Sequence, residues 1–507
     1  MTKNTIRLQY SGFVIFAAKM FSVATGLAFQ YMIARSTTKV EYGVWFNIND
    51  VLVYFTLLAG VLPFWAMRFA ARGEKGATKT GVLANLMISI AAVLVYLPFI
   101  PLMAEMLGVQ EYKHLYMLVS VQIVEVYLLN IFEACLRAKK PQALGYGALV
   151  AETLKVILGY VLIIRLQKSL EGAIISIIVA ITAQIIYYTV LLGDEFRQSG
   201  RWAYLKEWLK GSVANIYNAL GNQIASFIFI MLFTYGGEAA RGNYGAAFQI
   251  ANIVSYSSFL AFALYPKLLA EKNSQDIATS LKTVLMFAIP MTVGVLAVPE
   301  LYLAILKDEY IVAWPVLVVL AVDAFVATVS TIFVFVLYGF ERVDEKSKIS
   351  FKELAKSKLF LVFSLPYVHS AITIPLTFYV LTTYSLDSVQ SALSVAIINS
   401  TVRFAVFLFL YVVIRKMVKI MVPWKSVMRY VFASVIMGFA LYGLRGVLHP
   451  TRVYQILGLT AIGGLLYLAL LTMMDEDARM LAKSILQEVK NFRLRGVWLK
   501  HHCSKVQ

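Results

Sequence analysis

The chain has 507 residues, of which 60% are hydrophobic and only 15% are charged, and its mean hydropathy is +0.74. This composition is too apolar and too poor in charge for a soluble chain of this length, so lipid must be the solvent for most of it. The net charge of +18 would suit nucleic acid or anionic lipid head groups. The basic residues form short clusters between apolar runs, without the basic and aromatic stripe of a nucleic-acid binder, which favours the membrane surface.

Two local features narrow the class of protein further. The cysteines, Cys135 and Cys503, have neither a CxxC spacing nor a histidine partner, which argues against a disulfide or a zinc site. The apolar run 12–34 is longer than the core of a signal peptide and lacks a small-residue cleavage site, so it predicts the first transmembrane helix.

The hydrophobic pattern predicts an all-α, polytopic membrane protein with about fourteen transmembrane helices. Each expected helix is an apolar segment of roughly 20 residues, the length that crosses the hydrocarbon core. Prolines within several segments should kink the helices without ending them. In chain order the segments begin near Ser11, Gly43, Val82, His114, Ala143, Leu170, Gly211, Tyr244, Ser280, Val312, Leu359, Val389, Val427 and Val453.

The distribution of Lys and Arg predicts the orientation in the cell membrane. With both termini in the cytoplasm, the cytoplasmic segments hold 34 of the 46 basic residues, the external loops hold nine, and three lie within helices. Positive residues near helix ends stay in the cytoplasm, so this imbalance favours that orientation. The tail after Asp475 reads as a short amphipathic helix with a basic end, lying on the membrane face.

An internal repeat is visible between the two halves of the chain. The segment 42–48 (YGVWFNI) recurs at 244–250 (YGAAFQI), and Glu-Tyr at 111–112 recurs at 309–310. The alternative is chance similarity between apolar helices. Two copies of six helices would share one orientation and enclose a central cleft that opens to either side as the lobes rock. The predicted organisation is a lobe of helices 1 to 6 (1–193), a lobe of helices 7 to 12 (211–415), helices 13 and 14 (427–474), and a cytoplasmic tail (475–507).

Three cations fall inside predicted helices: Lys19, Lys155 and Arg403. An ionised side chain at the bilayer centre costs roughly 2.5–3.5 kcal/mol, so such residues normally face a cavity or a partner. At similar depth in both lobes, the three cations would suit a cleft that binds phosphate or diphosphate. For Lys155, an ion pair with Glu152 one turn away is an equal alternative.

Acids in the predicted helices are candidates for ion coupling, namely Asp50, Glu125 and Asp323. The repeat places Glu125 and Asp323 at corresponding positions. Such acids can relay protons or bind sodium, and the alternative is that they neutralise nearby cations. The polar residues of helix 7 either line the cleft or join helices: Asn215, Asn218, Asn222 and Gln223.

Sequence motifs give little support to an enzyme. GxSxG, HExxH, Walker A and dinucleotide-binding patterns are absent, and no external loop is long enough for a catalytic domain. We therefore expect neither a cofactor nor a metal. A polymerase or ligase whose active site is built by helices is the alternative from this class.

Several short motifs resemble a known family. Ala34-Arg35 with Glu41-Tyr42-Gly43, Asn243-Tyr244-Gly245, Leu264-Tyr265-Pro266 and Tyr338-Gly339 are similar to the polysaccharide-transporter branch of the multidrug/oligosaccharidyl-lipid/polysaccharide exporter superfamily. Its members are the O-antigen-type flippases of lipid-linked oligosaccharides. The resemblance implies a two-lobed fold and a cationic cavity. It also implies export of a glycan on a polyprenyl phosphate or diphosphate, for cell-surface polysaccharide or glycoprotein biosynthesis.

The resemblance adds one site residue and a set of partners. Arg35 becomes a further candidate for the cavity or its gate, with interfacial anchoring as the alternative. Asn222-Gln223 stands where the family often carries an acid. The implied partners are the lipid-linked glycan, membrane lipids, and glycosyltransferases or oligosaccharide-transferring enzymes. The main rival function is a drug or metabolite cation antiporter of the same superfamily, which would need an acidic, aromatic cavity.

The charge count generates a test of topology. The loops 68–81, 339–358 and 415–429 hold 4, 6 and 5 Lys or Arg and should face the cytoplasm. In a variant lacking Cys135 and Cys503, single cysteines in these loops should react with an impermeant maleimide only after permeabilisation. A cysteine at Ser385, in a predicted external loop, is the control and should react in intact cells. Labelling of the three loops from outside intact cells would show that the orientation is wrong.

Overall fold

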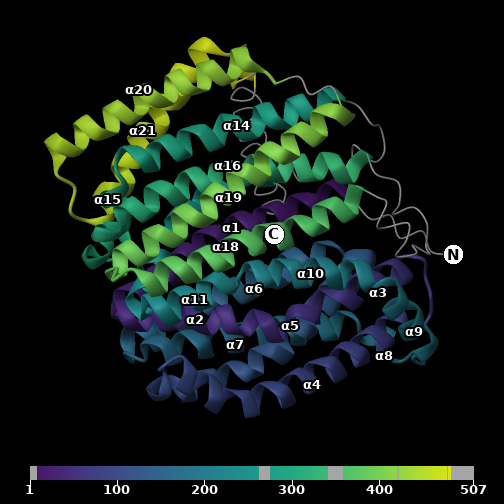
Figure 1. The fold of residues 1–507 in the computed structure, drawn as a ribbon. Coiled ribbons are helices and arrows are strands. Elements are labelled where there is room, and N and C mark those ends of the chain that lie inside the picture. Colours follow the sequence, from purple (N-terminus) through teal and green to yellow (C-terminus); the bar gives the residue numbers. More distant parts are fainter. Residues whose placement is uncertain (1–7, 262–273, 341–357, 419–421, 477, 481–507) are drawn as a thin grey trace, which may run out of the picture. The chain divides into compact units, whose positions relative to one another are not determined.

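The computed structural model of the protein describes residues 8–261, 274–340, 358–418, 422–476 and 478–480. Every regular element in these ranges is helical, and strands are absent from them, which confirms the all-α prediction (Figure 1). By length and composition, eleven helices of the described part can cross a membrane, or twelve if one bent pair is a single span. The protein is thus a multi-pass membrane protein.

Each of the fourteen predicted segments coincides with a helix or a broken helix, and the prolines of α4, α14 and α18 lie inside continuous helices as expected. Short helices α8 (Gly193–Phe196), α9 (Trp202–Gly211) and α15 (Pro299–Leu306) lie between them. In chain order the long elements are α1 (Leu8–Ser36), α2 (Lys39–Phe55) with α3 (Val61–Ala71), α4 (Ala77–Met106), α5 (Lys113–Lys139), α6 (Gln142–Gly159), α7 (Ser169–Leu191), α10 (Val213–Ala225) with α11 (Phe227–Gly236), α12 (Glu238–Ser255), α14 (Ser274–Ala297), α16 (Trp314–Phe340), α18 (Lys358–Thr383), α19 (Ser388–Met417), α20 (Trp424–Leu448) and α21 (Val453–Met474).

The second span is broken in its middle. Helix α2 begins with a capping box between Thr38 and Glu41, and it ends at Phe55. A 3₁₀ turn follows, and the chain continues at an angle of 56° into α3. The hydroxyl of Thr56 donates to the carbonyl of Leu52 at 3.1 Å, the kind of side-chain bond that bends membrane helices. The sequence predicted a single span here without the bend.

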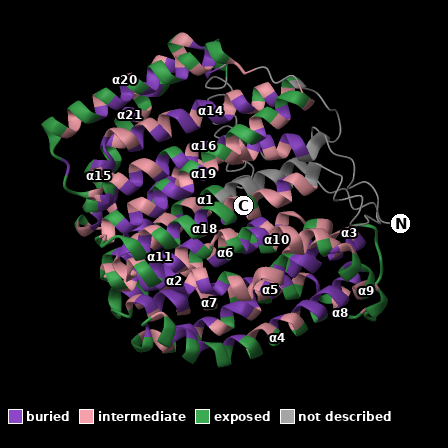
Figure 2. Cartoon of the chain, in the orientation of Figure 1, coloured by how far each residue is buried: buried purple, intermediate pink, exposed green. Residues whose placement is uncertain are grey.

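The chain forms two compact units, each built from separate stretches of sequence. The first comprises 1–250, 306–320 and 341–408. Within it α1 packs on α6, and both α10 and α11 pack on α18. These two pairings are equivalent if helices 1 to 6 and 7 to 12 are copies, although the lobe boundaries themselves stay a prediction. Helix α4 carries exposed apolar side chains along one side, as expected for a surface that faces lipid (Figure 2).

The second unit comprises 251–305, 321–340 and 409–507. Helix α14 packs on α20, and α20 packs on α21. At one end of α20, Arg429 donates to the buried carboxylate of Asp475 at 3.2 Å, and Lys282 lies 3.9 Å from the same group. At the other end Arg445 pairs with Glu300 at 2.9 Å. Ion pairs therefore fix both ends of this helix.

Helix ends that the charge pattern assigns to one side of the membrane meet in the first unit. Lys139 pairs with Glu195, and the hydroxyl of Tyr204 donates to Glu74 at 3.0 Å. All four belong to segments predicted as cytoplasmic. At the predicted external side, Lys307 donates to the carbonyl of Thr37 at 2.9 Å. The alternation of the spans agrees with these contacts, and which face is cytoplasmic stays a prediction.

The repeated Tyr-Gly segments of α2 and α12 contact each other directly. A Cβ atom at Gly43 would overlap the carbonyl oxygen of Glu238, and one at Gly242 would overlap the carbonyl oxygen of Lys39. A Cβ atom at Gly245 would overlap the ring of Phe46. Small residues let membrane helices approach this closely, which gives the recurring glycines a packing reason. The motif Leu264-Tyr265-Pro266 lies outside the described residues.

Candidate functional site

A buried ion pair joins α2 to α12 beside the glycine contact. The guanidinium of Arg241 donates from Nε to Oδ2 of Asp50 at 2.7 Å and from Nη2 to Oδ1 at 2.9 Å. The side chains of Arg241 and Asp50 are only 7% and 14% exposed. This two-pronged geometry is the strongest form of an arginine–carboxylate bond. Asp50, predicted as an ion-coupling candidate, therefore has a fixed cationic partner in the structure.

Aromatic rings surround the same guanidinium. Its central carbon lies 4.7 Å from the ring centre of Phe46, 5.1 Å from Phe229 and 5.8 Å from Tyr244. Cations are attracted to ring faces at these distances, most strongly where water is excluded. The rings come from α2, α11 and α12, so a single arginine holds three helices together.

Sequence reasoning missed Arg241. The charge count placed it in the external loop before helix 8, whereas the structure places it in the first turn and a half of α12, 6% exposed. Two signals were available. Asp50 lies inside a predicted helix and needs a cation, and Arg241 stands just before the repeated Tyr244-Gly245 pair.

Lys155 has the intrahelical partner that was one of its two predicted alternatives. Its Nζ lies 2.7 Å from Oε2 of Glu152, which also accepts a hydrogen bond from Thr25 of α1 at 2.5 Å. The ring centre of Phe29 is 5.6 Å from Nζ. The charge of Lys155 is thus balanced where α6 packs on α1.

The other predicted cations lie on two helices, α1 and α19. Lys19 belongs to α1, and its side chain is outside the described part. Arg35 is exposed in the last turn of α1, 5.3 Å from the ring centre of Tyr31. Arg403 is half-buried on α19. Arg35 and Lys155 thus have different neighbours in the structure: Tyr31 lies beside Arg35, and Glu152 lies beside Lys155.

The repeat-related acids are both buried. Glu125 on α5 is 4% exposed, and its Oε1 accepts a hydrogen bond from Thr182 at 2.6 Å. Its Oε2 has no hydrogen-bond partner among the described residues. Asp323 on α16 is 7% exposed. In the broken seventh span, the backbone carbonyl of Gln223 accepts from Tyr54 at 3.1 Å, which joins α10 to α2.

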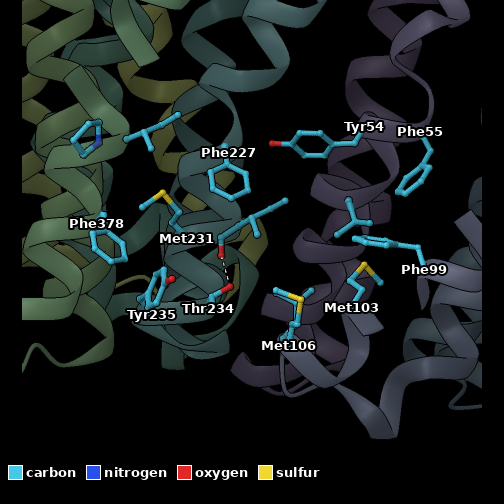
Figure 3. A pocket seen from close by; sticks show the side chains of 15 residues that line it. Tyr54, Phe55, Phe99, Met103, Met106, Phe227, Met231, Thr234, Tyr235 and Phe378 are labelled. Atoms are coloured by element: carbon cyan, nitrogen blue, oxygen red, sulfur yellow. Dashed lines mark hydrogen bonds between the residues drawn. The ribbon is translucent and has the colours of Figure 1, made fainter. Parts of the chain in front are cut away.

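The first unit contains a cavity of about 700 Å³ (Figure 3). Side chains of α2 and α4 form one wall, and side chains of α11 and α18 form the other. Helices of both halves of the predicted repeat therefore line it. No charged residue is among its lining residues in the described part of the chain, so this cavity differs from the cationic cavity that the family resemblance implies. Six of the lining residues are aromatic: Tyr54, Phe55, Phe99, Phe227, Tyr235 and Phe378.

Broken transmembrane helices beside a binding site recur in secondary transporters. Among solved structures, the chain is similar to the lipid II flippase MurJ in an inward closed conformation, with a TM-score of 0.64 and 15% identity over 92% of this chain and 99% of that one. It is also similar to an inward-facing multidrug resistance MATE family transporter of the MOP superfamily, with a TM-score of 0.58 and 16% identity over 80% of this chain and 98% of the other. An outward-facing MATE transporter gives a TM-score of 0.50 at 15% identity, over 80% and 94% of the two chains.

No family model and no curated protein matches the chain by sequence. The structural likeness shows that this chain has the fold of MOP-superfamily membrane transporters, the superfamily that the short motifs predicted.

The Asp50–Arg241 pair generates a stability prediction. Arg241→Met alone or Asp50→Leu alone leaves one charge buried without its partner, and each should cost about 3–5 kcal/mol of stability. The double variant removes both charges and should recover most of that loss. Thermal unfolding of the three purified variants in detergent measures this coupling. Additive losses in the double variant would contradict it.

Proposed function

We propose that this protein is a flippase that moves a glycan linked to a polyprenyl phosphate or diphosphate across the cell membrane by alternating access. The glycan would serve cell-surface polysaccharide or glycoprotein biosynthesis. Glycosyltransferases would supply the substrate, and oligosaccharide-transferring enzymes would consume it on the other side. The protein itself moves its substrate without a catalytic step.

The apolar cavity is the observation that carries this proposal. A drug-cation antiporter needs acidic groups among its aromatic rings to replace the cation's water, and the lining of this cavity in the described residues has none. A hydrocarbon chain needs only apolar surface. The likeness to the lipid II flippase also extends over 92% of this chain, against 80% for the MATE transporters.

The phosphate groups would be held by Lys19 and Arg403, with Arg35 and Lys155 as further candidates. A phosphate group that enters a low-dielectric cleft loses its water, and cations are the groups that compensate. Lys155 already has Glu152 beside it, so it would have to exchange that carboxylate for the substrate. Lys19 and Arg403, the cations for which the sequence favours a phosphate site, are the first residues to test.

The cation prediction uses single and double substitutions. Lys19→Ala and Arg403→Ala should each abolish flipping of a fluorescent polyprenyl-diphosphate glycan in proteoliposomes, because the diphosphate loses a counter-charge. Arg165→Ala is the matched control, since this exposed arginine lies at the end of the fifth span, beside Tyr160. Full activity of the double variant, at equal protein incorporation, would refute the proposed phosphate site.

Coupling to an ion gradient is a second proposal for the same cycle. Glu125 and Asp323 are buried acids on repeat-related helices, and in each copy an acid can bind a proton or a sodium ion in one state and release it in the other. The alternative is that each acid only hydrogen-bonds between helices, as Glu125 does with Thr182.

The coupling test compares amides with acids. Glu125→Gln and Asp323→Asn should each remove the dependence of flipping on a proton or sodium gradient while substrate binding persists. Glu105→Gln, at an exposed acid at the end of α4, should change neither property. If the wild-type protein flips its substrate equally well without any gradient, neither acid is a coupling site.

A further inference from the structure

The lining of the cavity of the first unit combines buried and exposed apolar side chains. Met103 and Met231 are 5% and 3% exposed and lie deep in its walls, whereas Phe99, Tyr235 and Phe378 are between 42% and 48% exposed. In Figure 3 the side chains of α2 and α4 face those of α11 and α18 across the open space. These exposed apolar side chains favour contact with hydrocarbon over water, so they suit a mouth through which a lipid chain enters the cavity.

Two of the three side-chain hydroxyls of the lining donate to backbone carbonyls. The hydroxyl of Tyr54 donates to the carbonyl of Gln223 at 3.1 Å, and the hydroxyl of Thr234 donates to the carbonyl of Ile230 at 2.9 Å. A polar solute would lose its water here and regain few hydrogen bonds, which is unfavourable. The cavity therefore selects a ligand that is recognised through hydrocarbon.

The lining suits a branched, unsaturated chain better than a straight saturated one. Three methionines contribute, Met103, Met106 and Met231, along with the six aromatic rings. Methionine side chains are flexible and polarisable and fit irregular shapes, and aromatic faces pack on methyl groups and double bonds. The volume of about 700 Å³ lies within the usual range for bound small molecules, so the cavity holds a part of a long chain rather than all of it.

We propose that this cavity binds part of the isoprenoid chain of the substrate's lipid carrier. The identity of the carrier rests on the proposed function, whereas the selection of hydrocarbon rests on the cavity alone. The isoprenoid chain would then be held by α2, α4, α11 and α18, while other residues hold the phosphate and the glycan. A site for the chain on the protein would keep the amphiphile attached when its head group is released.

The test is photolabelling of the purified full-length protein in detergent. The probe is farnesyl phosphate with a diazirine on its last isoprene unit. Labelled peptides should fall in 99–107 and 227–235, which contribute both walls of the cavity. Ile374→Trp places a larger side chain in the lining and should reduce this labelling about ten-fold by removing apolar burial. Met87→Trp, at a lipid-exposed position of α4 outside the lining, should leave it unchanged.

Two results would overturn the site. One is equal labelling of the same peptides in the wild type, in Ile374→Trp and in Val51→Trp, with all three proteins monodisperse. Val51→Trp is a second filling variant, from α2 in the opposite wall. The other is labelling by a diazirine-bearing phosphatidylcholine that excess farnesyl phosphate does not displace, which would assign the cavity to bulk lipid. Labelling needs no transport. Flipping that fails while displaceable labelling persists refutes the proposed function alone, and lost labelling with intact flipping refutes this site alone.

Discussion

The structure of the first unit depends on the close approach of α2 to α12, where a buried charge pair meets a glycine contact. An arginine and an aspartate in hydrocarbon are tolerable only while they touch, because either charge alone would face a large desolvation penalty. Gly43 and Gly242 permit the short distance, and Asp50 with Arg241 makes that distance necessary. The aromatic rings around Arg241 then fix α11 to the same point.

This junction also shapes the cavity beside it. Val51 follows Asp50 in α2, and Ile230 follows Phe229 in α11, and both belong to the lining. Asp50 belongs to the ion pair and Phe229 packs on it, and each directly precedes a lining residue. These contacts therefore fix where α2 and α11 stand in the walls of the cavity. Because the cavity is held open by contacts behind its walls, its lining can be free of charge and largely apolar and still keep its shape. The break after Phe55 lets α2 turn toward these partners while α3 packs on α5.

Much of the fold was readable from the sequence because lipid imposes simple rules. Spans of about 20 apolar residues, tolerated prolines and a charge bias between loops are each direct consequences of the bilayer. The site was less readable. Arg241 looked like a loop residue because the boundary of α12 could not be placed within a few residues, and the bend at Thr56 depends on one hydroxyl bond. The cavity involves side chains from four helices far apart in sequence, and no local pattern encodes that meeting.

The glycine contact has an evolutionary consequence. Across most of an apolar helix, Leu, Ile, Val and Phe exchange at little cost, so sequences drift until a fold is shared at 15% identity, as with the lipid II flippase. Gly43 and Gly242 do not have that freedom, since any side chain at either position meets the backbone of the opposite helix. Substitution there would demand a simultaneous shift of two helices and of the ion pair they carry. Those positions should therefore change most slowly, and these two glycines would outlast almost every other trace of common ancestry.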